Sequence, residues 1–318
     1  MKLISAFLYF LIIFSQNCYS KEVILSSGIG NYNHQDLWSQ YTAFKTYGNK
    51  NIISASSILA YYINENGSLE PYETNDTYWT AETYQQYIKD NTGLKSFPTL
   101  YCDATIGDCS NFNERIEKLY SNMTYFINDS IKRANLYNYD GYIVDFEPDS
   151  EVNTTKITDF ILEWNQALNY NNLSLNLWIG GNTPYDNRIL NVSNLLLTTM
   201  STYDNNYETF ITTAEQLQVN INDVSRLGFG LLTNYGDYNR KYQHKFDEQI
   251  NLVNQVSPLA SVNIFAHTKL NDTPINSSDL DNIVVWLALT QNTFLSLWTS
   301  HIDPSWHIPL NKFVQNDL

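Results

Sequence analysis

Short apolar runs rich in β-branched residues recur along the chain, and amphipathic segments separate them. Runs of this length are typical of buried strands. Seven are predicted as strands: Val23–Ser26, Ile52–Ile58, Phe97–Tyr101, Tyr142–Phe146, Leu173–Ile179, Leu196–Tyr203 and Leu227–Leu232. Helical spacing of apolar residues predicts helices at Ala81–Ile88, Glu114–Ala134, Ile157–Leu168 and Phe246–Val256. Strands alternating with helices over this length predict an α/β protein with a parallel sheet, a single-domain (β/α)8 TIM barrel.

Three runs compete for the eighth strand: Val262–Phe265, Ile283–Leu289 and Phe294–Trp298. The last of them lies between two helix-like segments, which begin near Ser278 and Asp303. A closing strand is expected between two helices, so we favour Phe294–Trp298.

The first twenty residues have the features of a signal peptide. Lys2 is followed by the apolar stretch Ile4–Phe14, and small residues come at Cys18–Ser20. The apolar stretch is shorter than the roughly 20 residues that a bilayer span requires. We therefore expect a signal peptide over residues 1–20 and a mature domain over residues 21–318, in preference to an uncleaved anchor. The mature protein would be secreted to the extracellular space or to the lumen of a lysosome-like compartment.

Sequons for N-glycosylation fit this route. We expect several to carry glycan and to lie on the surface. The candidates are Asn66, Asn75, Asn122, Asn128, Asn153, Asn172, Asn191 and Asn276, with Asn271 weakened by the nearby Pro274.

The mature chain retains two cysteines, Cys102 and Cys109, with six residues between them. In an oxidising compartment this short loop favours a local disulfide over two free thiols. Two thiols without a nearby histidine make a poor metal site.

The charge balance limits the possible partners. The formal net charge of -15 disfavours nucleic acid and anionic membranes, because both require a cationic surface. A Gly-x-Ser-x-Gly motif is absent from the sequence, and Gly28-Ile29-Gly30 lacks the third glycine of a dinucleotide loop. We expect no cofactor, no metal and a monomer without a membrane span.

Candidate chemistry lies in the segment Tyr139–Pro148. In a strand, alternate residues face opposite sides. The apolar set suits the layer beneath the helices: Tyr142, Val144 and Phe146. Asp145 and Glu147 then face the lumen, and Glu147 lies at the C-terminal end of the strand, where barrel enzymes hold their catalytic groups.

Two neighbouring carboxyl groups in such a position cannot both ionise freely, because like charge and burial raise the pKa of one of them. A carboxylic acid that stays protonated can donate its proton to a leaving oxygen. A strand-end pair held by ordinary hydrogen bonds remains the alternative.

The pattern Asp140-Gly141-x-x-x-Asp145-x-Glu147 resembles the D-G-x-D-x-D-x-E signature of family 18 glycoside hydrolases, which include chitinases and chitobiase-like enzymes. The segment Met200–Asp204 is similar to the Met-x-Tyr-Asp end of that family's sixth strand, with one extra residue. The segment Leu227–Leu231 looks like its seventh strand.

The resemblance implies hydrolysis assisted by the substrate, in which the sugar's own acetamido oxygen attacks the anomeric carbon. Glu147 would be the general acid and then the base, and Asp145 would orient the acetamido group. Tyr203 would hydrogen-bond the acetamido oxygen, and Asp140 would be structural. Further substrate contacts are expected from a tryptophan on the last strand and from the end of the sixth: Trp298, with Trp286 in reserve, and Asp204 and Met200.

Two departures from the family bear on activity and substrate class. Ile143 stands where the family has its first lumen Asp, which removes the usual partner of Asp145. The Ser-x-Gly-Gly of the third strand is replaced by Tyr101-Cys102-Asp103-Ala104.

Three functions follow as hypotheses. The first is a hydrolase of β-1,4-linked N-acetylglucosamine, in chitin or in the core of N-glycans, whose partner is an oligo- or polysaccharide. The second is a non-catalytic glycan-binding lectin on the same barrel, which Ile143 favours and Glu147 opposes. The third is a barrel hydrolase of other specificity that uses the same pair as acid and nucleophile.

Overall fold

The computed structural model describes residues 23–27, 37–38, 41, 44–45, 53–74, 76–104, 109–148, 151–179, 184–199, 226–232 and 261–266. The strands within this part are β1 (Val23–Ser27), β2 (Ala55–Ile63), β3 (Leu69–Pro71), β4 (Lys95–Ser96), β5 (Thr99–Asp103), β6 (Gly141–Glu147), β7 (Ser174–Ile179), β8 (Leu195–Thr199), β9 (Leu227–Leu232) and β10 (Ser261–Ala266). The helices are α3 (Ala81–Thr92), α4 (Phe112–Ser121), α5 (Met123–Leu136), α6 (Thr154–Tyr170) and the 3-10 turn η2 (Asn187–Asn191).

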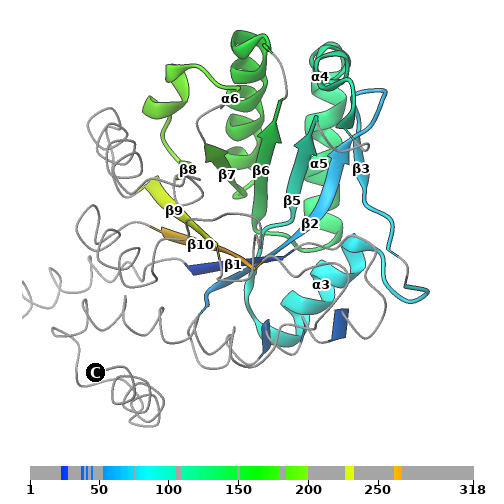
Figure 1. The fold of residues 1–318 in the computed structure, drawn as a ribbon. Coiled ribbons are helices and arrows are strands. Elements are labelled where there is room, and N and C mark those ends of the chain that lie inside the picture. Colours follow the sequence, from blue (N-terminus) through cyan, green and yellow to red (C-terminus); the bar gives the residue numbers. More distant parts are fainter. Residues whose placement is uncertain are drawn as a thin grey trace, which may run out of the picture.

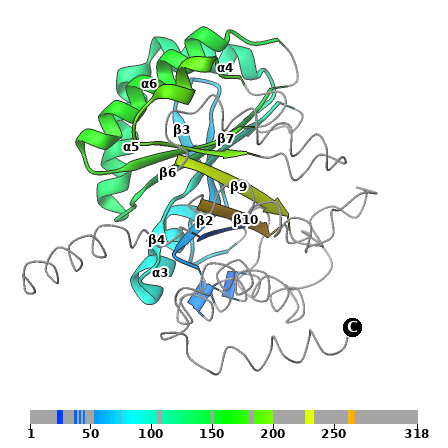
Figure 2. The same ribbon diagram turned by 90° about the vertical axis from the view of Figure 1, so that its left-hand side faces the viewer.

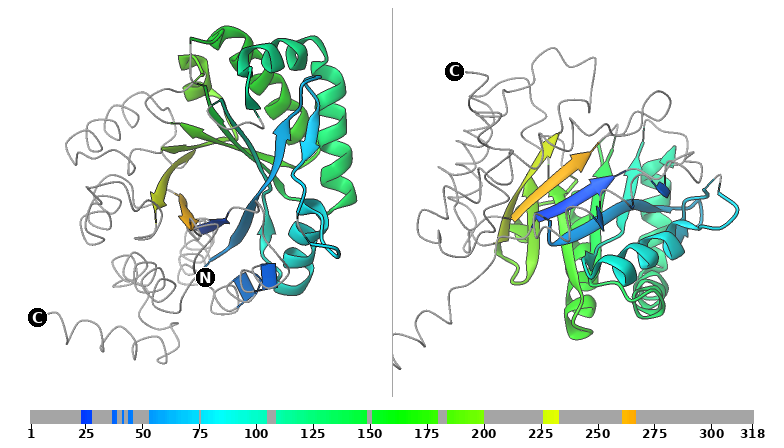
Figure 3. Two further views of the ribbon diagram at one scale, coloured as in Figure 1. Left: turned by 45° about the vertical axis from the view of Figure 1, so that its right-hand side comes forward. Right: turned by 90° about the horizontal axis from the view of Figure 1, so that it is seen from below.

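The parallel strands form a closed ring. The order is β1, β2, β5, β6, β7, β8, β9 and β10, and β10 pairs back with β1. Every neighbouring pair in this ring is parallel. Figure 3 shows the strands around a common centre, and α4, α5 and α6 cover the outer side of β5, β6 and β7 (Figure 1). The predicted parallel α/β barrel is therefore confirmed.

The closing strand differs from the predicted one. β10 lies beside β9 (Figure 2) and between β9 and β1 (Figure 3). Its register with β1 runs from Val23↔Val262 to Ser27↔Ala266. The preference for Phe294–Trp298 as the closing strand is therefore wrong, and the competing run at Val262–Phe265 fills that place. The error arose because position between two helix-like segments is a local criterion, whereas ring closure depends on pairing with the first strand.

Helical periodicity predicted the helices that cover the sheet but missed one boundary between two of them. The predicted helix Glu114–Ala134 is two helices that meet at Asn122, whose amide donates to the carbonyl of Lys118. The apolar spacing continues across this joint, so periodicity could not reveal it. The predicted stripe on α6 is fully buried: Ile157, Phe160, Ile161, Trp164 and Leu168.

Two apolar clusters fill the molecule on the two sides of the strands. The larger one lies between the sheet and the helices and contains Tyr142, Val144 and Phe146 of β6. A separate small cluster contains the alternate residue Ile143, together with Ile24, Ala55, Phe97 and Trp178 from other strands or their edges. Because side chains alternate along a strand, this second cluster marks the lumen of the barrel. We call this cluster of five residues the lumen layer.

The start of β6 is held tightly to its neighbours. The carboxylate of Asp140 accepts from the amide of Ser96 at 2.7 Å and pairs with Lys89 of α3 at 2.7 Å. Its carbonyl accepts from the amide of Ser174 at 2.9 Å. Gly141 lies so close to β7 that an added Cβ would be 2.0 Å from the carbonyl oxygen of Ser174. These contacts fix where the strand enters the barrel.

Candidate active site

Strand β6 carries two acidic residues to the lumen side of the ring. Asp145 and Glu147 alternate with Tyr142, Val144 and Phe146, all buried in the helix-side core. Glu147 is the last residue of the strand and is partly exposed. Asp145 lies two residues earlier on the same face of the strand, deeper in the barrel, and its Oδ1 is buried without a hydrogen-bond partner. The pair therefore occupies the C-terminal end of a barrel strand, with one oxygen of the deeper carboxyl group shielded from water.

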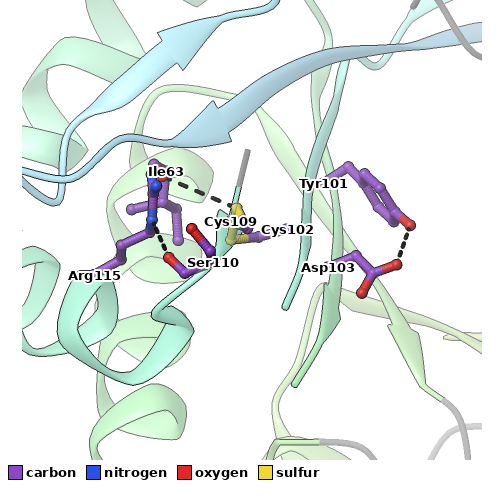
Figure 4. The surroundings of a disulfide bond; sticks show 7 residues. All are labelled: Ile63, Tyr101, Cys102, Asp103, Cys109, Ser110 and Arg115. Atoms are coloured by element: carbon purple, nitrogen blue, oxygen red, sulfur yellow. Dashed lines mark hydrogen bonds between the residues drawn. A yellow bond between two sulfur atoms is a disulfide. The ribbon is translucent and has the colours of Figure 1, made fainter. Parts of the chain in front are cut away.

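The neighbouring strand β5 adds a third acidic residue. Its register with β6 sets Tyr101 beside Asp145 and Asp103 beside Glu147. The Tyr101 hydroxyl donates to Oδ2 of Asp103 at 3.0 Å, and Asp103 is only 9% exposed. Figure 4 shows Tyr101 and Asp103 on the same side of β5. The site thus contains three carboxyl groups on two adjacent strands.

Burial and like charge control the protonation of this group. Burial raises the pKa of Asp145 well above its usual range, and the charges of Glu147 and Asp103 raise it further. Burial likewise raises the pKa of Tyr101, with Glu147, Asp145 and Asp103 adding to the effect. The protonated form of Asp145 is therefore favoured, and that form can donate a hydrogen bond.

A further tyrosine approaches Asp145 from the segment after β7. Tyr185 is 8% exposed, and its buried hydroxyl has no hydrogen-bond partner. Burial raises the pKa of Tyr185 well above its usual range, and the charge of Asp145 contributes. Burying a neutral hydroxyl without a partner costs about 1–3 kcal/mol.

A disulfide anchors the loop that follows β5. Cys102 and Cys109 are bonded at 2.06 Å, which confirms the predicted local pairing. Cys102 lies on the opposite side of β5 from Tyr101 and Asp103 (Figure 4). Arg115 of α4 also fixes this region, because it donates to the carbonyls of Ile63 at 2.6 Å and Ser110 at 2.9 Å.

Several predicted site residues lie outside the described part of the chain. They are Tyr203, Asp204, Met200, Trp286 and Trp298. The assignment of Trp298 depended on its being in the last strand, and that basis is removed because β10 is the closing strand. Asp140 is within the described part, where its contacts with Ser96 and Lys89 tie elements together at the opposite end of β6 from Glu147.

Sequence reasoning missed three residues of this site: Tyr101, Asp103 and Tyr185. The first two were noted only as a departure from a family motif. The two residues flank Cys102 at the end of an apolar run, and alternation along a strand places both on one face. That was a usable signal. Tyr185 had no such signal, because it follows the strand in a loop.

Every sequon asparagine in the described part of the chain is exposed. These are Asn66, Asn122, Asn128, Asn153, Asn172 and Asn191. Asn75 and Asn276, like Asn271, lie outside that part. The six positions lie in turns, on helix surfaces or at helix ends, where an attached glycan would extend into solvent.

Comparison with solved structures finds this fold among chitinases. A chitinase of Chromobacterium violaceum ATCC 12472 matches with a TM-score of 0.62 at 14% identity, over 85% of this chain and 99% of that one. The GH18 chitinase ChiB from the chitin utilization locus of Flavobacterium johnsoniae gives 0.60 at 13%, over 86% and 96%. The spore cortex-lytic enzyme SleL of Bacillus megaterium QM B1551 gives 0.58 at 12%, over 82% and 73%.

No protein-family model and no curated protein sequence matches this chain. At these identities the structural matches show the fold alone, a parallel α/β barrel like that of the chitinases. Within the described residues, no helix has both the length and the apolar character of a membrane span. The same residues contain no group of three or more His, Cys, Asp or Glu that could hold a metal ion.

Proposed function

We propose that this protein is a secreted glycoside hydrolase of β-1,4-linked N-acetylglucosamine, in chitin or the core of N-glycans. The observation that carries the proposal is the location of Asp145 and Glu147 on the lumen side of β6, at its C-terminal end. The fold shared with chitinases supports it, and so does the resemblance of this strand to the family 18 signature.

The proposed mechanism uses the substrate's acetamido group as the nucleophile, so the anomeric configuration is retained. Glu147, partly exposed at the strand end, protonates the glycosidic oxygen and then activates water. Asp145 in its protonated form donates a hydrogen bond to the acetamido group and directs the acetamido oxygen at the anomeric carbon. Tyr203 is proposed to hydrogen-bond the acetamido oxygen. Substrate contacts from Asp204, Met200 and a tryptophan remain part of the proposal.

One observation favours a second candidate, a glycan-binding lectin without activity. Ile143 lies in the lumen layer, so the lumen there is apolar where family members have an acidic residue. A lectin would bind the same sugars and release no product. The intact Asp145 and Glu147 make the hydrolase the stronger proposal.

The decisive test is the substitution Glu147→Gln, which keeps the size of the side chain and removes its proton. With a chitooligosaccharide or a high-mannose glycopeptide as substrate and mass spectrometry of products, we expect turnover to fall by about 10³-fold or more. Glu163→Gln, at an exposed position of α6, is the matched control and should retain full turnover. Equal turnover in the wild type and Glu147→Gln would reject the mechanism, and binding without product from the wild type would favour the lectin.

We also propose that the protein is exported by cleavage near residue 20 and glycosylated on exposed sequons. The six exposed asparagines and the disulfide support this route. Sequencing the N-terminus of the mature protein and treating it with a peptide N-glycosidase test both points. Absence of a mass decrease after treatment would reject the glycosylation. Sedimentation should give the mass of a monomer.

A further inference from the structure

Strand β6 has no acidic residue at position 143, where family 18 enzymes have the acidic partner of Asp145. Ile143, two residues earlier on the same face, belongs to the lumen layer and contributes only apolar surface. Oδ1 of Asp145 is nevertheless buried and lacks a partner. Burial makes the ionised form of this carboxyl group costly, and negative charges that face it from other positions add to that cost.

The neighbouring strand β5 supplies a carboxyl group at the level of Glu147, one layer above Asp145. β5 and β6 are paired from Thr99↔Ile143 to Asp103↔Glu147. Paired residues of parallel strands face the same side, so Asp103 lies above Asp145 and beside Glu147. The amide of Ala104 donates to the carbonyl of Glu147 at 2.9 Å, which continues the pairing one residue beyond the strand.

Asp103 is held in a defined orientation. The Tyr101 hydroxyl donates to its Oδ2 at 3.0 Å, and the preceding residue, Cys102, is fixed by the disulfide to Cys109 (Figure 4). Cys109 is itself buried against the β2 end, near the carbonyl of Ile63. The backbone next to Asp103 and its carboxylate are therefore both tied to neighbouring groups.

We propose that Asp103 is a positioning residue of this site, whose carboxylate replaces the acidic partner that position 143 does not provide to Asp145. The inference rests on the proposed glycosidase function and adds to it a residue from the third parallel strand of the ring. Asp103 acts through Asp145: its negative charge favours the protonated form, which is the form that can donate a hydrogen bond to an acetamido group.

The titratable groups around Asp145 also favour its protonated form. The titratable groups that act on it or feel it are Glu147 on its own strand, Tyr101 and Asp103 on β5, and Tyr185 after β7. The charges that act on Asp145 are both negative. The hydroxyl of Tyr185 is also buried without a hydrogen-bond partner, and the charge of Asp145 acts on it.

The test is the substitution Asp103→Asn, read by two independent measurements. First, ¹³C NMR of the carboxyl groups gives the titration of Asp145, with its signal assigned from Asp145→Asn. We expect the pKa of Asp145 to fall by about one unit in Asp103→Asn, because a like charge has been removed. Asp103→Glu keeps the charge and should retain most of the shift. Asp90→Asn, at an exposed position of α3, should leave it unchanged.

Second, steady-state kinetics on a chitooligosaccharide should show a kcat about tenfold lower in Asp103→Asn, with a much smaller change in KM. The limb of the kcat profile that reports loss of the Asp145 proton should move to lower pH, and Asp103→Glu should restore it in part. Asp103→Ser serves if the asparagine variant fails to fold.

An unchanged Asp145 pKa in the charge-removing variants would overturn the inference, and so would an unchanged pH profile. A wild-type protein that titrates as expected but releases no product would overturn the proposed hydrolase instead. The two failures are therefore separate.

Discussion

The contact between β6 and β7 at Gly141 makes a quantitative prediction. In Gly141→Ala the new Cβ would lie 2.0 Å from the carbonyl oxygen of Ser174 and 2.8 Å from its amide nitrogen. Both obstacles are backbone atoms, so the strands must separate by more than 1 Å for normal contact. Forced overpacking costs about 1–3 kcal/mol, and the hydrogen bond from the Ser174 amide to Asp140 adds about 1 kcal/mol if it is lost. The φ of 156° at Gly141 adds a conformational penalty of about 1 kcal/mol, so we expect a total loss of about 4 kcal/mol.

Gly93 provides the matched control. It ends α3 with φ 72°, and an added Cβ would meet nothing within 4 Å. Gly93→Ala should therefore cost only the conformational penalty of about 1 kcal/mol.

Urea unfolding of both variants measures the difference. With a slope of about 3 kcal/mol per M, the midpoint of Gly141→Ala should lie roughly 1 M below that of Gly93→Ala. Equal midpoints would show that β7 yields at this position and would refute the reasoning. Because β6 carries Glu147 six residues further along, Gly141→Ala should also lower turnover, whereas Gly93→Ala should not.

Three more predictions concern stability. Glu82→Gln removes the buried carboxylate that pairs with Arg133, and urea unfolding should show a loss of about 1–3 kcal/mol. Burial raises the pKa of Asp145 in the folded state, so its ionisation above about pH 4 opposes folding. Asparagine cannot ionise, so the stability of Asp145→Asn relative to the wild type should increase as pH rises. A stability difference independent of pH would contradict this. Replacing Cys102 and Cys109 by serine opens a loop of sequence separation 7 and should cost about 2.5 kcal/mol, whereas a change below 0.5 kcal/mol would argue against the constraint.

The parts of the fold that local pattern determines could be predicted from the sequence. Alternation along Gly141–Glu147 separates residues of the helix-side core from residues of the lumen, and the structure follows it at each position from Tyr142 to Phe146. The α6 stripe follows in the same way from a spacing that only a helix brings onto one face.

Features that depend on distant pairing could not be predicted. The closing strand is defined by its register with β1, more than 230 residues away in the chain, and three runs of similar composition competed for that place. Asp103 joins the site only because β5 pairs with β6 in one particular register. Local alternation places Tyr101 and Asp103 on one face of β5, but it does not define the register with β6, and a shift of one residue would turn Asp103 toward the helices.

The lumen layer has a consequence for how a glycan can reach the acids. Five buried apolar side chains from separate places in the ring pack together in the lumen, and one of them, Ile143, lies below Asp145 on the same face of β6. A polysaccharide therefore cannot thread through the barrel and must lie across its open end, with both of its ends on the same side of the molecule. Fragments released by cleavage must leave by the way the substrate arrived, so binding and release share one entrance.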